Sequence, residues 1–328
     1  MNSSPSADPI LFALSFDGEG GAREVGNADL AKAVRSSRTV WIHLNYASKD
    51  CRSVLENLIP DLDPSTISAL LSEDVRGRAT ERNDGILAVI RGANLHKDYQ
   101  PEQMNSLRCF LRSSVVVTIR KYQIFAVEDL IKRFQVGTGP IDSADFLVQL
   151  SHCALGNLEK ELEKLEDEID EMEDLAMEQP ENLSREGVLE ARRSVHHFLR
   201  HLLPQRDVYQ ILGQSTVPWV DEDSRIQLQE LHQTFIRIVA DLKSWKERTR
   251  LLQDEISNSL AQKLNEKLYL LSILTAVFLP LSFMTGLFGI NVGGIPGESE
   301  PWAFWTFTWL LLILVALELY IFKTRRWF

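Results

Sequence analysis

The chain has 328 residues, of which 45% are hydrophobic and 25% are charged, and its formal net charge at pH 7 is −11. An acidic chain lacks the basic footprint of nucleic-acid-binding proteins, so no nucleic acid is expected among its partners. Its three cysteines are far apart without a CxxC pair, which excludes a disulfide framework and a thiolate zinc site.

The N-terminal part predicts an α/β domain. Residues 1–9 are rich in Ser, Pro and Asp and are predicted to be disordered; they lack a signal-peptide pattern, so a cytoplasmic location is expected. Residues 10–137 alternate strands with helices, which is typical of an α/β cytoplasmic domain. The predicted strands are Ile10–Phe16, Val40–Asn45, Ile86–Ala93, Leu107–Leu111 and Val115–Arg120, and the predicted helices are Ala28–Arg35, Cys51–Leu58, Asp63–Leu71 and Ile124–Phe134.

No enzyme is predicted. The sequence shows no phosphate-binding loop, no nucleophile–base set and no metal triad. No resident cofactor is expected either.

Residues 138–220 predict a cytoplasmic helical layer. Its first helix carries a run of acidic residues between 159 and 174, including Glu166 and Asp170. The run is either a solvated face that repels its copies or a weak divalent-cation reservoir. The next helix, Ser184–Gly213, places His197 and His201 at i and i+4, a spacing that can chelate zinc. Its many arginines make it a poor cation site, and its basic face more naturally packs on the acidic helix.

Residues 221–267 predict a stalk helix that continues into a membrane. Apolar residues recur at alternating spacings of three and four, which is the heptad seam of a coiled coil. We expect this seam to help build an oligomer. Its members are Leu228, Leu231, Phe235, Ile238, Leu242, Trp245, Thr249, Leu252 and Ile256.

Two charge-poor segments predict a transmembrane hairpin, 268–290 and 302–322, joined by the short loop 291–301. Lysines precede the first span and a basic tail, 323–328, follows the second, whereas the loop carries Glu298 and Glu300. By the positive-inside rule both termini face the cytoplasm. The one charge inside a span, Glu318, has either a structural role or a proton-relay role.

The first span carries small and polar residues at helical spacing. Such residues suit a helix interface or a wet pore, and spacing alone leaves both open. Two helices cannot enclose a pore, so conduction demands an oligomer. The second span is mostly Leu, Ile, Val and aromatic residues and suits a lipid-facing ring. The residues concerned, just before the first span and within it, are Asn265, Ser272, Thr275, Leu279, Ser282 and Gly286.

The stretch from Gly286 to Gly297 resembles the signature of the CorA superfamily of divalent-cation transporters, which reads Gly-Met-Asn. Here Gly289, Ile290 and Asn291 stand at that point, and Gly-Ile-Asn followed by Val-Gly-Gly-Ile-Pro-Gly resembles the zinc-transporting ZntB branch. The resemblance covers the whole chain, from the α/β domain through the stalk to the hairpin and its basic tail.

This resemblance implies a funnel-shaped homopentamer in the bacterial inner membrane, with the long helices lining one pore. Asn291 would form an amide ring at the outer mouth, with Gly289 allowing a tight turn and Ile290 packing behind it. Glu298 and Glu300 would concentrate cations there. Asn265 would form an inner polar ring, and Leu268 and Leu279 would be apolar constrictions.

The implied activity is Zn²⁺ uptake coupled to protons, a Zn²⁺:H⁺ symport. No ring of His or Cys lies in the predicted pore, which favours passage of a hydrated ion. One alternative is a Mg²⁺/Co²⁺ channel gated by cytoplasmic divalent cation. The other is a coiled-coil membrane anchor that transports nothing. The cytoplasmic residues considered as metal ligands are His197, His201, Glu166 and Asp170.

Overall fold

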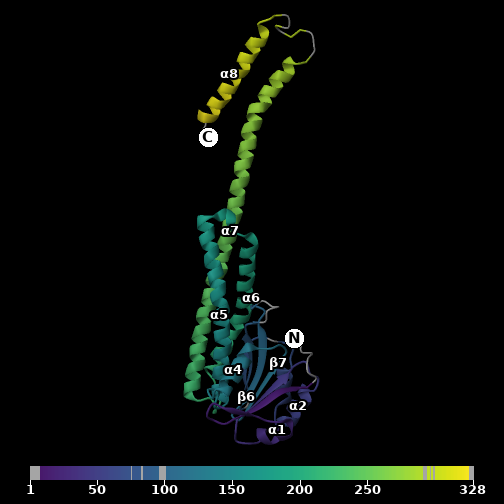
Figure 1. Ribbon diagram of the computed structural model, residues 1–328, viewed down its shortest axis with the longest axis vertical. Coiled ribbons are helices and arrows are strands. Elements are labelled where there is room, and N and C mark those ends of the chain that lie inside the picture. The colour runs from purple at the N-terminus through teal and green to yellow at the C-terminus, as the bar shows by residue number, and fades with distance from the viewer. Residues whose placement is uncertain are drawn as a thin grey trace. The chain divides into compact units, whose positions relative to one another are not determined.

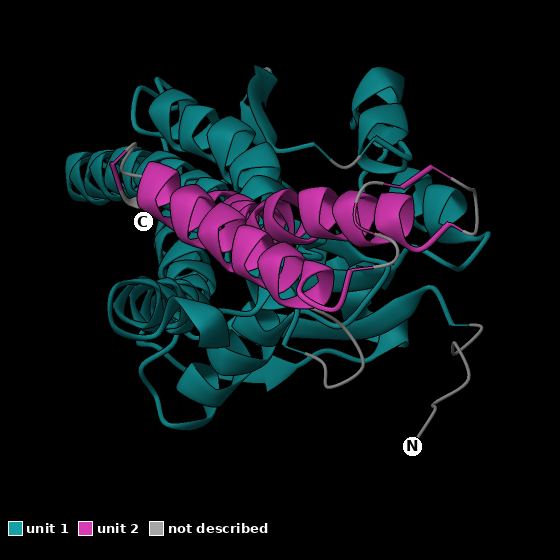
Figure 2. Ribbon diagram, turned by 90° about the horizontal axis from the view of Figure 1, so that it is seen from above, with its two compact units in different colours: residues 1–254 teal, residues 255–328 magenta. Residues whose placement is uncertain are grey.

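A computed structural model describes residues 8–74, 76–82, 84–95, 101–290, 294–295, 297 and 300–324. The chain divides into two compact units, residues 1–254 and residues 255–328 (Figure 2). The boundary lies within α7 (Glu222–Phe288), so the predicted stalk and first span belong to one helix, as expected. Pro280 lies inside this helix.

A seven-stranded mixed sheet forms the centre of the first unit. Its order is β2-β1-β3-β7-β6-β5-β4, and every neighbouring pair is antiparallel except β3 and β7. The parallel pair runs from Val40 opposite Val115 to Asn45 opposite Arg120. The strands are β1 (Ile10–Phe16), β2 (Ala22–Glu24), β3 (Val40–Asn45), β4 (Arg78–Arg82), β5 (Gly85–Gly92), β6 (Asn105–Arg112) and β7 (Val115–Arg120).

The five predicted strands are confirmed, and two further strands, β2 and β4, were not predicted. Both form edges of the sheet. Their sequences, Ala-Arg-Glu and Arg-Ala-Thr-Glu-Arg, are mainly polar. An edge strand exposed to water needs few apolar residues and benefits from charged ones. The apolar pattern therefore cannot reveal such strands.

Helices cover both faces of the sheet (Figure 1). One face packs against α1 (Asn27–Val34), α2 (Cys51–Leu58) and α3 (Pro64–Leu70). The other packs against α4, α5, α6 and the first part of α7. Because both faces are covered, all six residues of β3 are buried, including His43 and Asn45. The remaining helices are α4 (Phe125–Gln135), α5 (Ser143–Glu178), a short 3-10 turn at Pro180–Asn182, α6 (Arg185–Leu212) and α8 (Ala303–Thr324).

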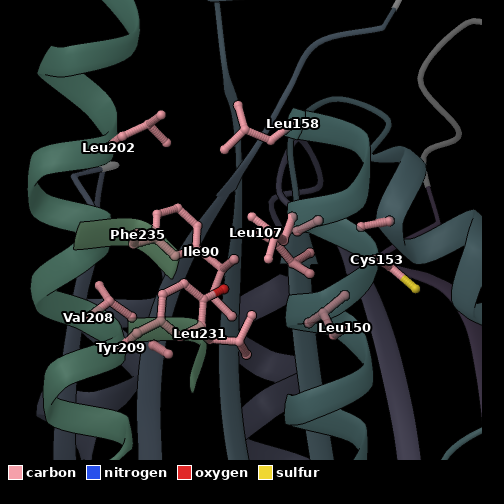
Figure 3. Close-up of a cluster of buried hydrophobic side chains, with 14 of the residues drawn as sticks. Ile90, Leu107, Leu150, Cys153, Leu158, Leu202, Val208, Tyr209, Leu231 and Phe235 are labelled. Carbon is pink, nitrogen blue, oxygen red and sulfur yellow. The ribbon is translucent and has the colours of Figure 1, made fainter. Parts of the chain in front are cut away.

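The heptad seam of α7 packs inside its own chain, so the prediction that it builds an oligomer is wrong. The Phe235 ring stacks on Tyr209 of α6, with ring centroids 4.8 Å apart. Figure 3 shows these two rings with Leu231 and Val208 in the cluster that also holds Leu158 of α5. A heptad pattern specifies a packing face but not whose helix covers it. The buried seam residues are Leu228, Leu231, Phe235, Ile238, Leu242, Trp245, Thr249 and Leu252.

His43 is a core histidine. Its ring stacks on Phe12, and its Nδ1 lies 2.6 Å from the hydroxyl of Thr118, which also accepts a hydrogen bond from the indole of Trp41 at 2.7 Å. Burial, and then the charge of Arg120, lower the pKa of His43 from 6.5 to about 3. The native protein therefore keeps this imidazole neutral.

We expect the free energy of unfolding to fall as pH drops below 6.5, by up to about 1.4 kcal/mol per pH unit from this one group. The unfolded chain binds a proton there that the native chain does not bind until pH about 3. His43→Phe, which keeps a ring against Phe12, should flatten that dependence. Chemical unfolding of the detergent-solubilised protein at pH 7.5 and 5 checks this. An identical pH dependence in both proteins would contradict it; part of the slope remains in the variant because burial also lowers the pKa of His201, to about 4.

Candidate functional site

Two described helices are long and apolar enough to cross a membrane. They are α7, through its C-terminal part, and α8 over Ala303–Phe322. None of the apolar window of either helix is buried inside the chain. A core helix of a water-soluble protein would be covered, and this much exposed apolar surface is unfavourable in water. The lipid bilayer is the environment that such helices fit.

Within the second unit, one side of α7 and one side of α8 are turned toward each other. The rings of Phe288 in α7 and Phe307 in α8 lie with centroids 4.7 Å apart. Half-buried residues recur at helical spacing on one side of each helix. On α7 they are Ile273, Ala276, Val277, Pro280, Leu281 and Met284, and on α8 they include Phe307, Leu311, Leu314 and Glu318.

The predicted pore-lining residues lie on the other side of α7. All of them are exposed, and their spacing of three and four residues keeps them on one stripe, opposite the half-buried side. We call this set of exposed residues the polar stripe. Its members are Asn265, Leu268, Ser272, Thr275, Leu279, Ser282 and Gly286.

Hydroxyl groups of the polar stripe bond to their own helix. Ser272 donates to the carbonyl of Leu268, and Thr275 donates to that of Leu271, both at 2.8 Å. Such bonds to the preceding turn satisfy the proton of a hydroxyl in an apolar surrounding. The oxygen keeps free lone pairs on its outer side, because a hydroxyl has two acceptor sites and one proton. The stripe therefore presents hydrogen-bond acceptors outward.

Glycine shapes the end of α7. The amide of Gly289 donates to the carbonyl of Gly286 at 3.2 Å. A Cβ on Gly289 would lie 3.0 Å from the carbonyl oxygen of Thr285, so a side chain there would press on the last turn. Ile290 is exposed after it. Asn291, the centre of the predicted ring, lies outside the described residues.

The loop has one described acidic residue. Glu300 is exposed, and its carboxylate accepts a hydrogen bond from the indole of Trp302 at 3.1 Å. Gly294 and Gly297 have φ of 103° and 88°, a backbone region that favours glycine. Glu298 lies outside the described residues.

The cytoplasmic candidates His197, His201, Glu166 and Asp170 do not form a common site. In the part of the chain that the structure describes, no three His, Cys, Asp or Glu side chains are arranged to hold a metal ion. Burial, followed by the charges of Arg91 and Arg200, lowers the pKa of His201 to about 4. Asp170 is engaged in an ion pair with Arg248.

The helix α6 packs on α5, as expected, but the ion pairs of the acidic helix come from α7. Arg248 of α7 pairs with α5, donating from Nε to Glu173 at 2.7 Å and from Nη2 to the same carboxylate at 2.6 Å and to Asp170. These bonds raise the pKa of Arg248. Among the described residues no arginine of α6 forms an ion pair with α5. A sequence signal existed: Arg248 directly precedes the seam residue Thr249, where coiled-coil helices place interhelical ion pairs.

Pro280 was a second feature missed from the sequence. It lacks an amide proton, so the carbonyl of Ala276 has no helical donor at that point. Both residues belong to the half-buried side of α7, away from the polar stripe.

Known proteins share this arrangement. A family model described as CorA-like Mg²⁺ transporter protein matches residues 36–325, which include strands β3 to β7 and both apolar helices. The zinc transport protein ZntB of Yersinia enterocolitica is 32% identical over 317 residues, covering 97% of this chain and 95% of that protein. The structure of the full-length CmaX protein matches with a TM-score of 0.86 at 29% identity, covering 100% of both chains. The CorA magnesium transporter of Methanocaldococcus jannaschii has the same fold, with a TM-score of 0.79 at 20% identity over 97% of this chain and 99% of that one.

Proposed function

Because the chain belongs to the CorA-like family of Mg²⁺ transporters, we propose that it carries divalent cations across a membrane, with Zn²⁺ as its main substrate. One chain supplies two apolar helices, which cannot enclose a pore. The proposal therefore includes an oligomer, a homopentamer as the resemblance implies. In it the α7 helices surround a central path, and the α8 helices form the outer ring.

The polar stripe is the observation that carries this proposal. A helix that only anchored the chain would have no need of polar groups turned away from its partner helix. Here the stripe lies on the exposed side of α7, opposite the side that packs toward α8. Several copies arranged around an axis would bring these stripes together, with α8 toward the lipid.

The chemistry of the stripe suits a hydrated ion. Water bound to a cation directs its protons outward, and the hydroxyl oxygens of Ser272 and Thr275 offer outward acceptors. The stripe contains no His or Cys to bind a dehydrated zinc ion. Leu268 and Leu279 would narrow the path as apolar constrictions that open by wetting.

The outer mouth of the path is proposed at the end of α7. There Gly289 and Ile290 would lead to a ring of Asn291 amides, and Glu298 and Glu300 would raise the local cation concentration. Both termini would face the cytoplasm and the loop the opposite side of the bacterial inner membrane, because basic residues flank the spans on the terminal side only.

The substrate assignment follows the relatives. The curated relatives with 32% identity carry the name zinc transport protein, and the residues Gly-Ile-Asn at 289–291 depart from the Gly-Met-Asn of the magnesium branch. Coupling to protons is proposed on the same resemblance. The family model's own description keeps Mg²⁺ as the second candidate substrate.

Metal uptake into proteoliposomes that hold a zinc-sensitive dye tests the function. We expect Zn²⁺ entry that grows with an inward-acid pH gradient and that collapses in Asn291→Ala. The loss is expected because a ring of amides would hold the waters of the entering ion. Zinc entry that ignores pH, or that equimolar Mg²⁺ outcompetes, would favour the magnesium channel. An intact oligomer that carries no metal would refute transport.

A further inference from the structure

Glu318 of α8 is the one charged residue in the two apolar segments 268–290 and 302–322. It lies on the half-buried side of α8, at helical spacing from Leu311, Leu314 and Phe307, the residue whose ring contacts α7. Its Oε2 atom is covered and has no hydrogen-bond partner in the part of the chain that the structure describes. A carboxyl group thus stands unpaired on the packing side of a membrane helix (α8 in Figure 1).

Within the two apolar segments 268–290 and 302–322, no oppositely charged residue accompanies Glu318. The apolar segment 268–290 contains no acidic or basic residue, and its one titratable group, Tyr269, is exposed. On α8 itself, Tyr320 is 65% exposed and lies on another side of the helix. The side chain of Lys323, five positions further on, lies outside the described residues.

The covered Oε2 atom also shows that Glu318 does not behave as a snorkelling carboxylate. A snorkelling carboxylate near a helix end would expose its oxygens to the membrane surface. Here Oε2 is covered instead. An ionised carboxylate without a partner is costly in such a place, whereas a neutral carboxylic acid is compatible with it.

We propose that Glu318 is the proton-binding residue of the transport cycle; this rests on the proposed zinc transport. In this scheme the carboxyl carries a proton while α8 is packed against α7. When the C-terminal end of α8 separates from α7 and admits water, the acid releases its proton to that water and becomes a carboxylate. In the proposed orientation this end faces the cytoplasm, so the proton leaves on the side to which zinc is delivered.

Glu318 does not contact the ion in this scheme. The polar stripe lies on the side of α7 that is turned away from α8, so the carboxyl and the path are on opposite sides of that helix. Coupling would pass through the packing of α8 against α7. Protonation favours the packed arrangement, and ionisation favours the separated one.

Proteoliposomes containing the full-length oligomer test this with two dyes, one for zinc and one for pH. The variants are Glu318→Gln, a neutral group of the same shape, and Tyr320→Phe, a matched control that removes a polar group from the exposed side of the same helix. Each coupled proton gives up to about tenfold in zinc accumulation per pH unit of gradient. We expect zinc uptake by Tyr320→Phe to be accelerated by the pH gradient as in the wild type. Glu318→Gln should lose this acceleration together with zinc-dependent proton entry.

Each result has a defined meaning. Acceleration and proton entry that persist in Glu318→Gln would overturn the role of Glu318 while zinc transport stands. If the variant shows no net uptake, exchange of labelled zinc at equal pH decides: exchange retained supports the proposal, and exchange lost from an intact oligomer overturns it. A wild-type protein that moves no zinc would instead refute the function on which the proposal rests.

Discussion

Zinc entry into vesicles should fall at least about tenfold when Thr275 is replaced by valine. The two side chains have nearly the same shape, so the change removes one hydroxyl per chain and adds one methyl. Each lost hydrogen bond to a passing hydrated ion costs about 0.5–1.5 kcal/mol, and every copy in the oligomer loses one. A tenfold effect corresponds to about 1.4 kcal/mol. The apolar section around Leu279 would also lengthen toward Ser272, and a longer apolar section dewets more readily.

Thr306→Val is the matched control for this experiment. Thr306 lies on α8, is exposed, and donates from its hydroxyl to the carbonyl of Trp302 at 3.2 Å, as Thr275 does to Leu271. The same chemical change there should leave zinc entry near the wild-type rate. Equal losses in both variants would mean that the hydroxyls serve the helices and not a path. An unchanged Thr275→Val would exclude the polar stripe as the lining.

Leu242→Ala should lower the free energy of unfolding by about 2–5 kcal/mol, because Leu242 is fully buried and its loss leaves a cavity. For a unit of this size that corresponds to a fall in melting temperature of roughly 4–20 °C. Ile236→Ala, on the same helix but 41% exposed, should change it little. Thermal unfolding of the detergent-solubilised protein, followed by circular dichroism, measures both.

The dependence of stability on protein concentration distinguishes a seam packed within one chain from a coiled coil between copies. Packing inside one chain predicts that the loss in Leu242→Ala is the same at low and high protein concentration. A coiled coil between copies would make the loss depend on concentration, because association then contributes to stability. Such a dependence, or equal effects of the two alanine variants, would contradict the packing described for α7.

The elements with a strong apolar pattern were predictable from the sequence. Five strands, the helices of the first unit and the long helix that begins near residue 221 were all expected near their observed bounds. Polar edge strands such as β2 were not, because their residues face water. The seam of α7 was recognised as a packing face, but its partner was assigned to other copies. Periodicity does not show which chain covers a helix. In the structure, α5 and α6 of the same chain cover the seam.

The candidate site was predictable in part. The spacing from Asn265 to Gly286 placed one stripe on α7, and the structure shows that stripe exposed and turned away from α8. The sequence left the alternative of a helix interface open, because spacing does not say where α8 packs. The pairing of Arg248 with Glu173 depends on the distance between two helices far apart in the chain. The covering of Glu318 depends on the rotamers of its neighbours, which no pattern of residue types encodes.

The seam that α7 buries within its own chain has a consequence for biogenesis. The partners of Leu228 and Phe235 come from α5 and α6, which precede them on the ribosome. The core of the first unit can therefore form within each chain, without waiting for a second chain. Assembly of the proposed oligomer would then join first units whose cores are already complete. The two apolar segments follow this unit in the chain, so in the proposed membrane protein their insertion would come after the residues of its core have been made.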